Sequence, residues 1–118
     1  MKYMLLIYGD EGAWDDAGRA ACYSDSAQVA RDLHANGKLL STNALHPVST
    51  ATSVRSGGSS RMITDGPFAE TREQLGGYFL IDANDLDEAI EIAKTIPGGR
   101  LGTVEIRPVY EVEGLPEF

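Results

Sequence analysis

An unbroken apolar and aromatic stretch, YMLLIY at Tyr3–Tyr8, opens the chain and decides its fold. A run of this kind, with no polar position, is typical of a β-strand that is buried on both faces. It is much shorter than the roughly 20 apolar residues of a transmembrane helix, and no signal-peptide cleavage site follows it. A strand buried on both faces requires a packed layer on each side of its sheet.

The rest of the chain alternates between helical and strand signals. Helical spacing occurs within residues 13–36 and after Asp85, and strand patterns occur at 39–45, 50–56, 60–64, 77–83 and 102–110. A Gly-Gly pair at 57–58 joins two of the short runs as a hairpin. The order β-α-β, hairpin, β-α-β predicts an α+β fold with a ferredoxin-like antiparallel sheet carrying two helices on one face. A length of 118 residues fits one domain, 1–118.

Local signals mark the ends of both helices. Side chains able to cap a helix occur at 24–26 (SDS), and an Asn-Gly pair at 36–37 is a typical helix end. Whether 13–36 forms one helix or two stays open. The second helix begins at Asp85, where Glu88 three residues later makes a carboxylate version of the capping box.

Two helices on one face leave the other face of the sheet without a cover. Because Tyr3–Tyr8 has no polar side to show to water, a second copy of the sheet is the simplest cover. We therefore expect a symmetric homodimer. Area scaling for 12.7 kDa predicts a folded surface of roughly 6,200 Å² for a compact monomer.

Composition excludes several classes of partner. The chain has 10 Lys and Arg against 18 Asp and Glu, a net charge of −8, and its basic residues are scattered singly. Nucleic-acid binding and attachment to an anionic membrane both need clustered positive charge, so neither is expected. A single cysteine, Cys22, forms no internal disulfide, which fits the reducing cytoplasm.

The motifs of metal and cofactor sites are missing from the sequence. His34, His46 and Cys22 lack the close spacing of a zinc site, and no glycine-rich phosphate loop occurs. We predict neither a metal nor a tightly held cofactor. Cys22 is expected to be a small buried thiol on a helix.

The densest local signal is the turn Asp65-Gly66-Pro67-Phe68. In a structural interpretation, Asp65 accepts hydrogen bonds from the amides that follow it, Gly66 is extended before the proline, and Phe68 packs in the core. In a functional interpretation, the rigid turn aims the Asp65 carboxylate into a cleft as a base or ligand anchor. The residues alone leave both open.

Three further groups have two interpretations each. His46 is the one imidazole near a strand end, so it is either a proton shuttle or an exposed loop residue. Arg55 and Arg61 flank the hairpin glycines and suit either a cross-strand salt bridge or anion binding. Glu105 and Arg107 share one strand face, as mutual partners or as an ion pair across the dimer.

The stretch TDGPFAETREQLGGY at 64–78 resembles the signature of the DGPF proteins, a branch of the YCII-related family. Residues 1–8, 51–55, 85–90 and 102–109 are similar to other parts of the same family. The resemblance implies a dimeric α/β barrel of ferredoxin-like subunits. It carries the family aspartate over to Asp65, whereas no histidine of this chain matches a motif position. It also implies a regulatory partner, an extracytoplasmic-function sigma factor.

Two functions follow from these observations. In the first, the protein binds a small polar metabolite near the turn and catalyses acid-base chemistry without a metal, of an isomerase or lyase type. Asp65 and His46 are then the candidate catalytic residues. The residues expected to bind substrate are Arg55, Pro67, Phe68, Glu70 and Tyr78. In the second, the protein is a non-catalytic regulatory or binding module associated with a sigma factor.

Overall fold

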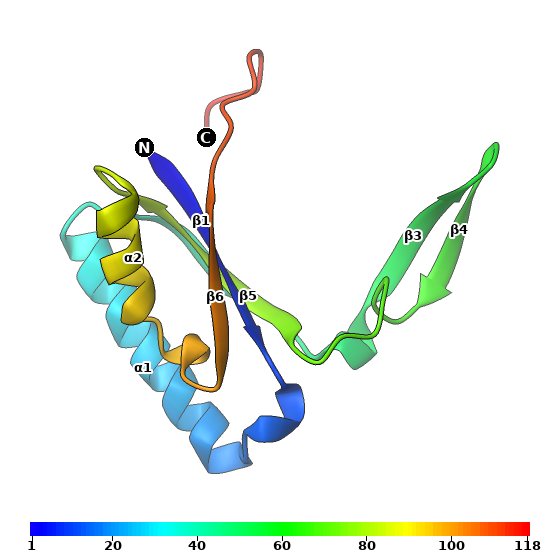
Figure 1. Ribbon diagram of the computed structural model, residues 1–118, viewed down its shortest axis with the longest axis horizontal. Coiled ribbons are helices and arrows are strands. Elements are labelled where there is room, and N and C mark those ends of the chain that lie inside the picture. Colours follow the sequence, from blue (N-terminus) through cyan, green and yellow to red (C-terminus); the bar gives the residue numbers. More distant parts are fainter.

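The computed structural model describes all 118 residues and contains one four-stranded sheet, two helices and a separate hairpin (Figure 1). The strands are β1 (Lys2–Gly9), β2 (Leu39–Ala44), β3 (Thr52–Gly57), β4 (Ser60–Asp65), β5 (Gln74–Asp82) and β6 (Gly102–Pro108), and the helices are α1 (Asp16–Ala35) and α2 (Leu86–Lys94). The sheet order is β2-β5-β1-β6, with every neighbouring pair antiparallel. This order confirms the predicted ferredoxin-like α+β sheet.

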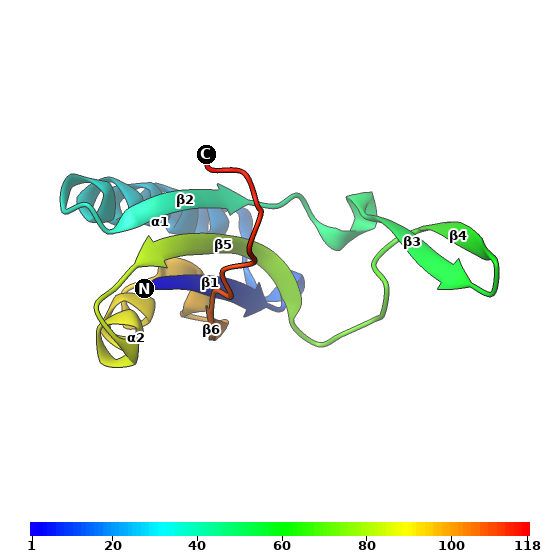
Figure 2. The same cartoon turned by 90° about the horizontal axis from the view of Figure 1, so that it is seen from above.

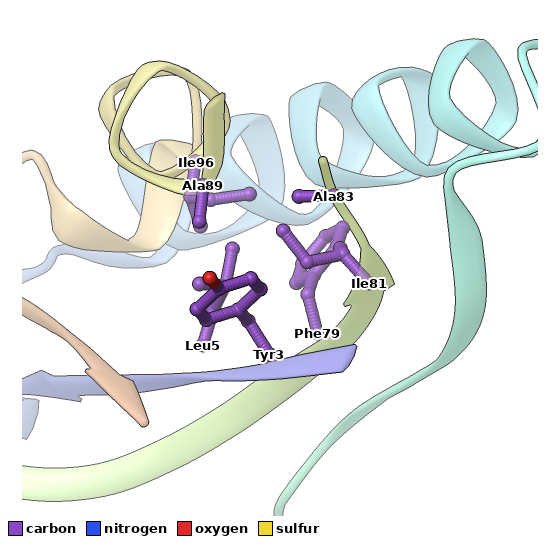
Figure 3. Packing of buried hydrophobic residues seen from close by; sticks show 7 residues of the cluster. All are labelled: Tyr3, Leu5, Phe79, Ile81, Ala83, Ala89 and Ile96. Carbon is purple, nitrogen blue, oxygen red and sulfur yellow. The ribbon is translucent and has the colours of Figure 1, made fainter. Parts of the chain in front are cut away.

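The hydrophobic core lies between the sheet and the helices. Tyr3 and Leu5 of β1 and Phe79 and Ile81 of β5 are almost fully buried. Figure 3 shows these side chains pointing from the strands toward the segment that carries Ala89 and Ile96. Because side chains alternate along a strand, Met4 and Leu80, which lie between these buried residues, point to the opposite face of the sheet. Helices cover only the first of these two faces.

The range 13–36 contains one long helix, α1, rather than two. Asp15 caps α1 by accepting a hydrogen bond from the amide of Gly18 over 2.6 Å, and Asn36 ends the helix as expected. The prediction that residues 24–26 begin a helix was wrong, because they lie inside α1 and their polar side chains do not interrupt it. Asp15 is the better cap since its carboxylate reaches an amide that has no partner within the helix.

The start of α2 confirms half of the predicted capping box. Asp85 accepts from the amide of Glu88 over 2.9 Å. The Glu88 carboxylate does not return to Asp85; it accepts from the amide of Asn84 and from Lys38 Nζ over 2.8 Å. The Lys38–Glu88 ion pair therefore joins the segment before β2 to the first turn of α2.

The hairpin β3–β4 extends away from the body of the molecule, as Figure 2 shows. The radius of gyration is 16.0 Å, compared with about 13.5 Å for a compact domain of this length. The accessible surface is 8387 Å², roughly 2,200 Å² above the value that area scaling predicts for a compact monomer. A single copy is therefore less compact than area scaling predicts, since an isolated hairpin buries little of its own surface.

Candidate functional site

A cavity of about 470 Å³ lies between residues 19–30 of α1 and the sheet. The small side chains on its two walls explain the space: Ala27 and Ala30 on α1 face Ala44, Gly76 and Gly77 on the sheet. The second half of α1 packs its larger residues against the core instead. Ala30 takes part in both, since it lines the cavity and also packs against the core.

Glu11, in the 3₁₀ turn Glu11–Ala13 (η1) after β1, holds the mouth of the cavity together. Its carboxylate accepts from the amide of Val48 at 3.0 and 3.3 Å, and its own amide donates to Gln74 Oε1 over 3.1 Å. Its carbonyl oxygen accepts from Arg19 Nη2 over 2.7 Å. These bonds connect η1 to α1, to β5 and to the linker between β2 and β3.

The cavity wall carries two carboxylates and one guanidinium. Both oxygens of Glu11 are engaged by Val48, whereas Asp10 uses only Oδ1, which accepts from the amide of Gly12 over 2.8 Å. Arg19 is partly buried and forms no salt bridge with any carboxylate of the chain. Asp10 Oδ2 and most of the Arg19 N–H groups are therefore left for a ligand.

A flat aromatic surface completes one side of the cavity. Trp14, the only tryptophan, lines it, and a methyl group added at Gly18 would contact the indole ring at 3.5 Å. The indole therefore lies against the first turn of α1, and the tight neighbour at Gly18 is the capping carboxylate of Asp15, whose Oδ1 would be 2.9 Å from an added methyl group. Cys22 is buried, as predicted, and lines the same cavity with Tyr23. This combination suits a planar ligand with polar edges.

The Asp65 turn lies elsewhere, at the base of the projecting hairpin. Asp65 ends β4 and is exposed, and its carboxylate accepts no hydrogen bond within the chain. Gly66 has φ +99° and its amide donates to Ala51 O over 2.7 Å. The predicted side-chain turn at Asp65 and the extended Gly66 were therefore wrong, because backbone pairing with the opposite strand holds this turn.

The other residues of the turn are also outside the cavity. Phe68 is 75% exposed, so its predicted place in the core was wrong. Arg55 makes no salt bridge, and its Nη2 donates to the carbonyl oxygen of Phe68 over 2.7 Å. Pro67 and Glu70 are exposed. The structure brings Arg55 to the turn, and the role of these residues as a binding site stays a prediction.

Tyr78 and His46 are near the cavity in sequence but do not line it. Tyr78 lies between Gly77 and Phe79, which line the cavity, so it points to the opposite face of the sheet. Its hydroxyl bonds with Ser41 Oγ and Asn43 Nδ2, each over 2.9 Å. These bonds, that from Ser41 above all, lower the pKa of Tyr78 below 10.0. His46 is exposed in the loop after β2.

The cavity residues were missed because no spacing motif marks them. Asp10, Glu11, Trp14 and Arg19 follow β1 closely, and that position was the available signal: chemically diverse side chains directly after a buried strand. The structure brings together no group of three or more side chains suited to hold a metal ion. None of its helices has both the length and the apolar character that a membrane span requires.

Comparison with known proteins identifies the family. The YCII-related domain matches residues 1–113. The chain belongs to the YCII-related family. A relative from Rhizobium meliloti (strain 1021), itself an uncharacterized protein, is 36% identical over 123 residues, covering 98% of this chain and 99% of the relative. Assignment to the DGPF branch of the family stays a prediction.

The family member is also similar in structure to a solved enzyme. That enzyme is the 5-chloro-2-hydroxyhydroquinone dehydrochlorinase TftG from Burkholderia phenoliruptrix AC1100, in complex with 2,5-dihydroxybenzoquinone. The TM-score is 0.57 at 13% identity, over 96% of this chain and 97% of the enzyme. At this identity the similarity establishes the shared α+β fold, with its antiparallel sheet and two helices.

Proposed function

We propose that this YCII-family protein binds a small ring compound in the cavity between α1 and the sheet and catalyses proton transfer on it. The observation that carries the proposal is the cavity itself: about 470 Å³, with an indole wall and a free carboxylate oxygen at its mouth. This volume lies within the usual range of small-molecule sites. A solved enzyme of the same fold holding a six-membered ring supports the choice of ligand.

Asp10 is the proposed proton acceptor, because Glu11 has no oxygen free of the Val48 amide. In the proposed step, Asp10 removes a proton from a ring carbon next to a carbonyl group. The C–H electron pair moves into the carbonyl to give an enolate, and the proton stays on Asp10 until it is returned to another ring carbon. The ligand is thereby isomerised with no change in its atoms.

The test uses 2,5-dihydroxybenzoquinone with the full chain. Binding is followed by quenching of Trp14, the only tryptophan, and by protection of Cys22, the only cysteine, from iodoacetamide. Catalysis is followed by NMR on a second probe, 1,4-cyclohexanedione, as exchange of its hydrogens with deuterium from the solvent. This ring compound has sp3 C–H bonds beside each carbonyl group, which the proposed enolate step requires. We expect Asp10→Asn to slow this exchange at least about 100-fold while the Kd changes little, as is typical for loss of a general base.

Asp65→Asn is the matched control, since it removes a carboxylate from the hairpin. If it abolishes binding while Asp10→Asn does not, the site lies at the Asp65 turn and the proposed cavity site is wrong. If the wild type neither binds the quinone nor protects Cys22, the proposed function is overturned. The regulatory alternative with a sigma factor would then be the prediction left to examine.

We further propose that the protein acts as a homodimer in which the bare sheet faces meet. Met4 and Leu6 of β1 and Leu80 of β5 are only partly covered on this face, and Leu6 is paired with Glu105 in the β1–β6 register. A row of partly covered apolar side chains on one face of a sheet is the kind of surface that a second copy can bury in a symmetric interface. Because β1 has no polar side to show to water, a second copy of the sheet is the simplest cover for this face.

A further inference from the structure

The guanidinium of Arg19 is the one positive group on the wall of the cavity. It lies on α1, one turn after the Asp15 cap, and is partly buried against the sheet side of the helix. Its one side-chain hydrogen bond goes from Nη2 to the carbonyl oxygen of Glu11 over 2.7 Å. A guanidinium has five N–H donors, so most of those of Arg19 have no acceptor within the chain.

Six of the ten basic side chains have no carboxylate partner, and among these six only Arg19 is partly buried. The chain has 18 carboxylate side chains and a net charge of −8, and four of its ion pairs involve other lysines or arginines. Two carboxylates, Asp10 and Glu11, line the same cavity, yet neither pairs with Arg19 because backbone amides hold them. A partly buried cation in such surroundings is suited to an anion supplied from outside.

We propose that Arg19 is an anion anchor and that the ligand of this cavity is a ring compound bearing a carboxylate. The proposal rests on the function proposed above, that the cavity binds a small ring compound. The bond to Glu11 fixes the guanidinium, so its remaining N–H groups form a preorganised fork for a carboxylate. The ring then lies beside Trp14, and Arg19 offsets the repulsion between the ligand and Asp10.

The experiment compares two probes of nearly the same shape, 2,5-dihydroxybenzoate and its neutral amide, 2,5-dihydroxybenzamide. Affinities are measured by titration calorimetry and by Trp14 quenching. For the wild type we expect the acid to bind at least about tenfold more tightly than the amide, as a charge-assisted bidentate contact requires. Arg19→Gln is expected to remove this preference and to leave the affinity for the amide nearly unchanged.

Two further variants separate anchoring from folding. Arg19→Lys keeps the charge without the fork and should retain part of the preference for the acid. Arg31→Gln removes an exposed arginine of the same helix, one that donates only to Gln28, and should behave as the wild type does.

Equal binding of acid and amide by the wild type overturns the anchor but leaves the cavity site intact. An equal loss of affinity for both probes in Arg19→Gln would overturn the anchor as well, because it would show that Arg19 only stabilises the contact between η1 and α1. Binding of neither probe by the wild type overturns the cavity site and the anchor together.

Discussion

The carboxylate of Glu11 accepts the backbone N–H of Val48 over 3.0 Å, and this bond connects two segments that are 37 residues apart. Glu11 follows β1, and Val48 begins the 3₁₀ turn Val48–Thr50 that leads into the projecting hairpin. Because Glu11 also binds Gln74 and Arg19 through its backbone, the bond fixes the mouth of the cavity relative to the hairpin base. The cavity thus depends on this one side chain for its shape.

Replacement of Glu11 should destabilise the fold and loosen the cavity mouth. Glu11→Ala leaves the Val48 amide without its acceptor, and we expect a loss of about 1–3 kcal/mol in the free energy of unfolding. Glu11→Gln keeps an oxygen in the same place and should lose less. Urea denaturation measures both variants. Equal stability of Glu11→Ala and the wild type would show that water replaces the carboxylate at no cost.

The Lys38–Glu88 ion pair should make stability depend on pH in the acid range. The Lys38 ammonium, with the Asn84 amide as a second donor, holds the pKa of Glu88 below 4.5. A carboxyl with a lowered pKa in the folded state stabilises fully above its unfolded pKa, and the contribution disappears as the pH falls through the lowered value. Lys38→Met should therefore lower the melting temperature at neutral pH and much less at strongly acid pH.

Lys94→Met is the control for this prediction, because it removes an exposed lysine paired with Glu91 on the surface of α2. It should change the melting temperature little at any pH, as exposed pairs usually contribute little. A Lys38→Met curve that stays parallel to the wild-type curve down to low pH would contradict the assignment to Glu88.

Tyr78 should ionise below the usual range of a tyrosine. Its hydroxyl has Ser41 and Asn43 as hydrogen-bond partners, and donors to the phenolate favour the ionised form. Ser41→Ala is expected to raise the pKa of Tyr78 toward 10.0, and Asn43→Ala to raise it less. NMR titration of a Cζ-labelled tyrosine measures the pKa, with Tyr78→Phe assigning the resonance. A Tyr78 pKa that Ser41→Ala leaves unchanged would exclude the serine as its main cause.

The fold was predictable because hydrophobic spacing and turn chemistry agree along most of the chain. Tyr3–Tyr8, the Gly57-Gly58 hairpin and the Asp85 cap each indicate one local structure, and each is found there. The helix at 16–35 was harder, since residues 19–30 line a cavity and so lack the apolar stripe that identifies a packed helix. The side chains that line the cavity therefore weaken the helical pattern in the sequence, and the same side chains form the candidate site.

The candidate site was predicted less well than the fold. The Asp65 turn attracts attention because its residues are unusual in sequence, yet it is held mainly by backbone bonds to β3 and by Ser53 Oγ, which donates to Gly66 O over 2.7 Å. The cavity instead joins residues from β1, α1, β2 and β5, each ordinary in its own context. Only tertiary packing brings Arg19 and Trp14 together with Gln74, and no local sequence pattern predicts that they line one cavity.

A side chain added at Gly77 should disturb the sheet beside the cavity. A Cβ atom there would lie 2.8 Å from the carbonyl oxygen of Asn43 and 3.3 Å from Ala44 Cα, both backbone atoms of β2. Gly77→Ala therefore forces β2 and β5 apart, and we expect a loss of about 1–3 kcal/mol in the free energy of unfolding. Gly9→Ala is the control, since nothing lies within 4 Å of its Cβ. Similar stabilities for the two variants would contradict the close approach.

The proposed dimer makes a prediction about charge. Glu105 and Arg107 lie on the bare face of β6, next to Leu6 and Met4 of β1, and the chain contains no salt bridge for either of them. In a two-fold symmetric interface, Glu105 of one copy can meet Arg107 of the other. Arg107→Glu should then weaken the dimer by placing like charges together, and Glu105→Arg combined with Arg107→Glu should restore it.

Sedimentation equilibrium at several protein concentrations distinguishes these outcomes. We expect a dimer for the wild type, a dissociation constant at least about tenfold higher for Arg107→Glu, and recovery in the double variant. Leu6→Asp, which puts a charge in the apolar centre of the face, should give a monomer, whereas Leu86→Ser, at an exposed position at the start of α2, should not. A wild-type monomer at all concentrations would refute the dimer, because the bare apolar face of the sheet would then be stable in water.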